Sequence, residues 1–199
     1  MAQTSNLRAS PRLGKRKPED PPSATTTVKS PKDKVAKTET SEEAKTEIKL
    51  DGFNINFALI KAEEVKSFRE LKDHPVGTLQ GIGPKYAGEL EKLGLKTIQQ
   101  MADYKFYHLA KCIKTLAQTE ETGNRLESSK MNLESGLIKE FEPYALKDLL
   151  EQPIHALQGL SPAADKTFDA LGVKTIEQFA DFKYFHWAEA IVTAAKWEL

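Results

Sequence analysis

Residues 79–98, LQGIGPKYAGELEKLGLKTI, decide the fold expected of this chain. A short apolar stretch ends in the turn GIGPK (residues 81–85), and apolar residues then recur at three-residue steps up to Leu93. Two glycines allow a tight backbone turn and leave its N–H groups uncovered. Pro84 suits the first position of a helix, because its φ is already helical and the N–H it lacks would have no partner there. The stretch predicts an exposed turn, an amphipathic helix over residues 84–93, and Gly94 in the left-handed position just past its end.

Uncovered amides at the start of a helix favour an anion. The stretch resembles the helix-hairpin-helix family, closely over residues 75–98, and members of that family bind nucleic-acid backbones without reading sequence. The resemblance implies that amides of the turn hold a phosphate, that the two glycines permit its close approach, and that nearby lysines add positive charge. The nucleic-acid-binding residues implied in this way are Gly81, Ile82, Gly83, Lys85, Lys92 and Lys96.

The chain contains this stretch twice. A shift of 78 residues aligns 53–117 with 131–195 without a gap, and the last 39 aligned positions hold 18 identities. The repeat unit is therefore 65 residues long, enough for a small helical module. We expect an all-α protein built from two tandem modules, each formed around a helix-hairpin-helix. A single disordered tail is expected to precede the first module.

The expected domains are a basic tail at 1–47, a first module at 48–117, a linker at 118–130 and a second, degenerate module at 131–199. The tail holds five of the ten prolines and has no apolar periodicity, so it buries too little surface to offset the entropy of ordering. Its KRKP motif at residues 15–18 has two interpretations, a nuclear-import signal or a solvated basic patch. No run is apolar enough for a membrane span, and the single cysteine indicates a reducing, intracellular compartment.

The second hairpin reads GLSPA (residues 159–163), with Ser161 in place of Gly83 and Ala163 in place of Lys85. We expect the Ser161 side chain to cap the following helix and so to occupy an amide that a phosphate would use. The first repeat holds 10 Lys/Arg against 7 Asp/Glu, whereas the second holds 5 against 10. Because affinity for nucleic acid comes largely from neutralising phosphates, the first hairpin is the expected binding site. The acidic second module is left as a surface for a protein partner.

Within each module the pattern predicts further elements. Residues 54–68 predict a helix, Thr97 is expected to cap a short helix over 98–102, and Asp103 is expected to cap a last helix over 104–117. That last helix begins with KFYH in the first copy and with KYFHW in the second. These rings either stack on bases or fill the core, and their helical spacing and recurrence in the acidic copy favour the core.

The sequence offers no nucleophile–base pairing, no phosphate loop and no metal-ligand spacing, so we expect a non-enzymatic binding protein without metal or cofactor. Three functions stay open. The first is binding of DNA or RNA backbone through the first hairpin. The second is a structural or protein-interaction module, which is favoured by 18 Lys/Arg against 22 Asp/Glu beyond residue 50. The third is a small-molecule carrier with a pocket between aromatic-rich helices.

Overall fold

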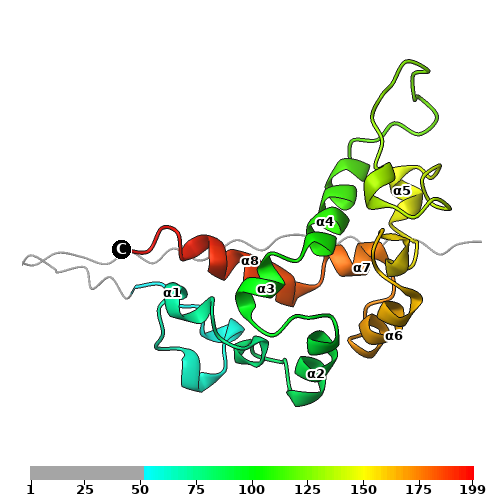
Figure 1. Ribbon diagram of the computed structural model, residues 1–199. Coiled ribbons are helices and arrows are strands. Elements are labelled where there is room, and N and C mark those ends of the chain that lie inside the picture. Colours follow the sequence, from blue (N-terminus) through cyan, green and yellow to red (C-terminus); the bar gives the residue numbers. More distant parts are fainter. Residues whose placement is uncertain (1–51) are drawn as a thin grey trace, which may run out of the picture. The chain divides into compact units, whose positions relative to one another are not determined.

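A computed structural model describes residues 52–199, and the tail predicted at 1–47 lies outside the described residues. Every regular element of the described part is helical and only isolated bridges pair backbone, so the all-α prediction is confirmed. None of these helices is both long enough and apolar enough to cross a membrane. The α-helices are α1 (Phe68–Leu71), α2 (Pro84–Lys92), α3 (Ile98–Ala102), α4 (Lys105–Ala117), α5 (Leu146–Leu149), α6 (Pro162–Ala170), α7 (Ile176–Ala180) and α8 (Lys183–Ala194) (Figure 1). The 3-10 turns are Asn56–Ala58, Lys61–Glu63, Val76–Thr78, Glu134–Gly136 and Ile154–Ala156.

The local signals around α2 act as the sequence predicts, with one exception. Pro84 is the first residue of α2, and Gly94 follows its end with φ +80°. The Thr97 hydroxyl accepts a hydrogen bond from the amide of Gln100 at 3.2 Å and so caps α3. The expected cap of α4 by Asp103 is wrong, because that carboxylate instead accepts from the Gln99 side chain at 2.6 Å, and the helix begins after Tyr104 without a side-chain cap.

The helix predicted over residues 54–68 is wrong. This segment forms two 3-10 turns, and Val65 within it is 91% exposed. Its backbone pairs with the strand-like approach to the first hairpin: the Ile60 amide donates to Thr78 O at 3.0 Å, and the Gln80 amide donates to Ala58 O at 2.8 Å. Those tertiary hydrogen bonds use the donors and acceptors that a helix would have used.

The last helix of each repeat packs on the other repeat. Helix α3 of the first repeat packs mainly against α8 of the second, and α7 of the second packs mainly against α4 of the first (Figure 1). Helix α4 also contacts α5, and α8 makes the equivalent contact with α1. The two repeats therefore interlock, and residues 52–199 lie in one compact unit. The helices that pack together therefore come from both repeats, and neither sequence repeat is a separate packed body.

The core is one cluster that runs through both repeats, and it confirms the core interpretation of most of the aromatic residues. Tyr107 and Phe185 are fully buried and stack with ring centroids 5.1 Å apart. Phe168 and Phe179 are also fully buried, with centroids 4.6 Å apart. Removing a large ring of this kind from water contributes roughly 2–3 kcal/mol. Because the rings come from both repeats, this stabilisation is shared between them.

A polar network also joins α4 to α8. The Tyr107 hydroxyl donates to Glu189 at 3.0 Å and lies 3.0 Å from Nδ1 of His186. Burial, together with the Glu189 carboxylate, raises the pKa of Tyr107. Burial alone would raise the pKa of Glu189, but hydrogen bonds from Lys111 at 2.5 Å and from Tyr107 outweigh it and lower that pKa. The network keeps a buried hydroxyl and a half-buried carboxylate paired.

Each last helix is followed by a glutamate that caps the first helix of the other repeat. Glu198, after α8, accepts from the Phe68 and Arg69 amides at 3.1 and 2.9 Å. Glu120, after α4, accepts from the Leu146 and Lys147 amides at 2.9 and 3.0 Å. The two glutamates are 78 positions apart, which is the spacing of the repeat. The same pair of hydrogen bonds between the repeats therefore forms at both ends of the interlock.

Candidate nucleic-acid interface

The first hairpin is an exposed turn anchored by one apolar side chain. Ile82 is only 4% exposed, and its amide donates to Leu79 O at 3.0 Å. Gly83, Pro84 and Lys85, which follow it, are exposed. The turn is therefore fixed from below and open to solvent from above.

Four backbone amides of this turn have no acceptor within residues 52–199. They belong to Gly81, Gly83, Lys85 and Tyr86, at the beginning of the nine-residue helix α2. The first turn of α2 carries no acidic side chain. Unpaired amides and the positive end of a helix together form a site suited to a phosphate oxygen.

The glycine at position 83 is not required by the backbone. Gly83 has φ −75° and ψ 173°, and Ser161 takes nearly the same conformation in the second hairpin, with φ −96° and ψ 163°. A Cβ at Gly83 would meet no atom within 4 Å. Because Gly83 has no Cβ, the neighbouring amides stay open to a group that approaches from solvent.

Gly81, in contrast, is required by the fold. Its φ is +100°, and a Cβ there would collide with the hydroxyl of Tyr184 on α8. Gly159 at the same place in the second hairpin has φ +105° and is covered by Phe106 on α4. Each hairpin is therefore closed from behind by an aromatic residue of the other repeat.

This packing brings Lys183 close to the first hairpin. Its Nζ lies 4.9 Å from the ring centroid of Tyr184, whose hydroxyl lies against Gly81. Lys183 is absent from the site predicted from the sequence, because it lies in the other copy of the repeat. The available signal was the lysine that begins the aromatic run in both copies, at positions 105 and 183.

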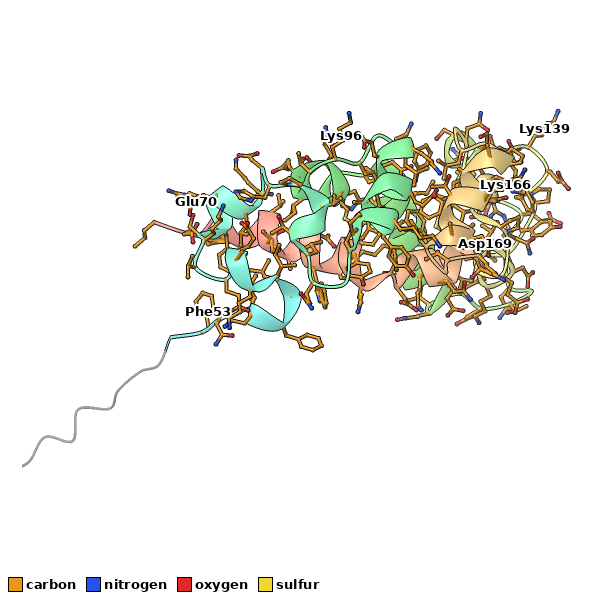
Figure 2. The ribbon with its side chains drawn as sticks, turned by 90° about the horizontal axis from the view of Figure 1, so that it is seen from below. Phe53, Glu70, Lys96, Lys139, Lys166 and Asp169 are labelled. Carbon is orange, nitrogen blue, oxygen red and sulfur yellow. The ribbon has the colours of Figure 1, made fainter. Side chains whose placement is uncertain are left out.

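The three lysines predicted for the site have different surroundings. Lys85 is exposed and makes no ion pair within the described part of the chain. Lys92 pairs with Glu89 at 2.7 Å, and Lys96, which extends into solvent in Figure 2, pairs with Glu91 at 3.0 Å. The charges of the last two are compensated locally, so Lys85 and Lys183 are the cations available to an anion at the turn.

The second hairpin keeps the backbone but differs in chemistry. The cap expected from Ser161 is wrong, because its side chain makes no hydrogen bond to α6. Asp165 instead places a carboxylate in the first turn of α6, where it pairs with His155 at 2.5 Å. Lys105 supplies a cation near Gly159, 4.0 Å from the position of a Cβ. The first turn of α6 therefore carries a negative charge that the first turn of α2 lacks.

The interlock also changes the charge around each hairpin. Residues 53–104 together with 183–195 hold eight Lys/Arg and eight Asp/Glu. Residues 105–117 together with 131–182 hold seven Lys/Arg and nine Asp/Glu. The strong contrast between a basic and an acidic repeat is therefore much smaller between the packed halves, and the difference between the hairpins lies in individual residues.

No protein-family model, curated protein or solved structure matches this chain, so the interpretation of the site rests on its own geometry.

Proposed function

We propose that this protein binds the phosphate backbone of nucleic acid through its first hairpin, without reading sequence and without catalysis. In this proposal the chain carries two tandem helix-hairpin-helix repeats, of which the second is degenerate. The amides of Gly81, Gly83 and Lys85 donate to phosphate oxygens, Ile82 holds the turn in place, and the Lys85 ammonium supplies charge. Lys92 and Lys96 take part only from a distance, because their charges are already paired.

The observation that carries the proposal is the contrast between the two glycines. The glycine that the backbone needs, at 81 and 159, is present in both hairpins. The glycine at 83, which the backbone does not need, is present only in the hairpin whose own turn carries a lysine, Lys85, and whose following helix has no acidic side chain in its first turn. A residue without a side chain at that point favours close approach of a ligand to the amides.

The test is a binding titration with the full-length chain and labelled single- and double-stranded DNA at low salt. Gly83→Ser, which installs the residue of the second hairpin, should weaken binding about tenfold or more, since a lost charge-assisted hydrogen bond costs roughly 1.5–3 kcal/mol. Its effect on stability should be small, because the serine fits the same backbone. Lys85→Ala should weaken binding and also lower the slope of log affinity against log salt by about 0.7–0.9.

Ser161→Gly is the matched control, because it makes the opposite change at the equivalent position of the second hairpin. It should leave affinity unchanged. A second control replaces Arg12, Lys15, Arg16 and Lys17 by serine in the full-length chain, which measures what the tail contributes. If only this tail variant loses binding, the hairpin is not the site. If no variant and no salt condition yields binding, the proposal is wrong.

The alternative is a structural or protein-interaction module, and one observation favours it. Two of the three predicted binding lysines, Lys92 and Lys96, are neutralised by neighbouring glutamates, and the packed half that contains the first hairpin has no net charge. A dedicated nucleic-acid domain is usually more basic. If the folded full-length chain binds neither DNA nor RNA at low salt, this alternative is supported.

A further inference from the structure

Beside the first hairpin lies an aromatic ring that the fold does not bury. Phe57, in the 3-10 turn Asn56–Ala58, is 85% exposed. Its segment is tied to the hairpin by the hydrogen bond from the Gln80 amide to Ala58 O at 2.8 Å and by the bridge between Leu59 and Leu79. The ring is thus held next to the turn that presents the free amides.

Phe57 belongs to a continuous row of rings that ends at Gly81. Its edge faces Trp187 of α8, with centroids 6.2 Å apart and planes at 80°. Trp187 meets Tyr184 edge-on at 5.6 Å, and the Tyr184 hydroxyl lies against Gly81. Lys183 Nζ lies 5.1 Å from the Trp187 ring centroid and 4.9 Å from that of Tyr184. We call Phe57, Lys183, Tyr184 and Trp187 the ring surface.

The second hairpin has no such surface. Ser135 stands where the first repeat has Phe57, and Leu109 stands where the second has Trp187. Leu109 lies against Gly136, 2.9 Å from the position of a Cβ there. The same fold is therefore built without an exposed ring at this place, whereas the buried positions 106 and 107 and their equivalents 184 and 185 are aromatic in both copies. Packing does not account for Phe57.

We propose that the ring surface makes the first hairpin a site for single-stranded nucleic acid, with a base stacked on Phe57 and the neighbouring phosphate on the hairpin amides. This inference rests on the proposed function. A single strand alternates phosphates and exposed base faces, and the site alternates amides and Lys183 with rings. A duplex hides its base faces within the stack. An apolar protein segment covering the rings would leave Lys183 and the amides unpaired.

The matched test compares two phenylalanines of equal exposure. Phe57 and Phe53 are each 85% exposed, but Phe53 stacks on Phe68 at 6.1 Å at the start of the described chain (Figure 2). In the full-length protein, Phe57→Ala should weaken binding of an oligothymidine of about 16 nucleotides about tenfold, within the range for loss of one stacked base. Its affinity for the corresponding duplex and its salt slope should stay unchanged. Phe53→Ala should change neither affinity.

A second readout follows the ring surface directly. The chain has two tryptophans, so Trp197→Phe leaves Trp187 as the only one. Oligothymidine should quench or shift the emission of Trp187, and Phe57→Ala should reduce that change at equal saturation.

The outcomes separate this inference from the proposed function. If Gly83→Ser and Lys85→Ala weaken binding while Phe57→Ala does not, the phosphate site stands and the stacking inference is wrong. If Phe57→Ala weakens duplex and single-strand binding equally, the preference for single strands is wrong. If no hairpin variant changes binding, both are wrong.

Discussion

Gly81 and Gly83 are two residues apart and serve different purposes. Gly81 has a positive φ and lies against Tyr184 of the other repeat, so the fold depends on it. Gly83 has an ordinary extended backbone and open space around it. The sequence predicted both glycines as a pair that lets a ligand approach. In the structure only Gly83 has open space around it, because the Tyr184 side chain that covers Gly81 comes from a distant part of the chain.

Gly81→Ala should destabilise the protein more than Gly94→Ala. Both glycines have positive φ, which costs an L-residue about 1–2 kcal/mol. Only at Gly81 would the new methyl group also strike a neighbour, the Tyr184 hydroxyl, at an added cost of about 1–3 kcal/mol. Urea denaturation measures the difference. Adding Tyr184→Phe to Gly81→Ala should recover part of the loss, whereas equal losses at both glycines would mean that α8 does not cover the turn.

Tyr104 should make stability fall in alkaline solution. Burial raises its pKa from 10.0 to about 12, so the folded protein holds the phenolic proton more tightly than the unfolded chain does. This contribution is complete below pH 10 and is lost as the pH rises toward 12. Tyr104→Phe should make the fall in unfolding free energy over this range shallower, by up to about 1.4 kcal/mol per pH unit. An unchanged pH profile would contradict the burial of this hydroxyl.

At the scale of elements, the sequence predicted well what is local. The start of α2 at Pro84, the left-handed Gly94 and the cap at Thr97 each depend on neighbours within a few residues. The helix predicted over residues 54–68 is wrong because two of the segment's backbone hydrogen bonds are made with the hairpin approach, more than a dozen residues away. Lys183, Trp187 and Phe57 were likewise outside the predicted site, since tertiary packing alone brings them to the hairpin.

The glutamates that follow α4 and α8 give a prediction about these elements. Helix α5 has no side-chain cap of its own and depends on Glu120, whereas α1 is also capped by Ser67, which accepts from the Glu70 amide at 3.2 Å. Glu120→Ala should therefore lower the unfolding free energy by about 1–2 kcal/mol, and Glu198→Ala by less. Urea denaturation tests the order, with the exposed neighbour Glu121→Ala as the control. Equal effects of Glu120→Ala and Glu121→Ala would contradict the cap.

At the scale of the molecule, the internal repeat was visible in the sequence but its packing was not. Identity at a spacing of 78 residues shows which elements correspond, and it does not show which copy a helix packs against. Because α4 and α8 each pack on the other repeat, the charge and the aromatic neighbours of a hairpin come from both copies. The first repeat is basic when its own residues are counted, but the packed half that contains the first hairpin has no net charge.

The interlock predicts that neither repeat folds as a monomer. A chain ending at residue 130 lacks α8, so the buried face of α3 formed by Ile98 and Met101 would be open to water. Residues 131–199 alone lack α4, the partner of α7. Circular dichroism and sedimentation should show no folded monomer for either piece and a helical one-to-one complex when they are mixed. A helical monomer of either piece alone would contradict the interlocked packing.

The central claim, that the first hairpin and not the second holds a phosphate backbone, is tested most directly by an amide NMR titration of the full-length chain with oligothymidine. The claim predicts that the amide signals of Gly81, Gly83, Lys85 and Tyr86 shift together and saturate, while those of Gly159, Ser161 and Ala163 stay in place. Shifts in the second hairpin alone, or no shift in the first hairpin under conditions in which the chain binds the strand, would contradict it.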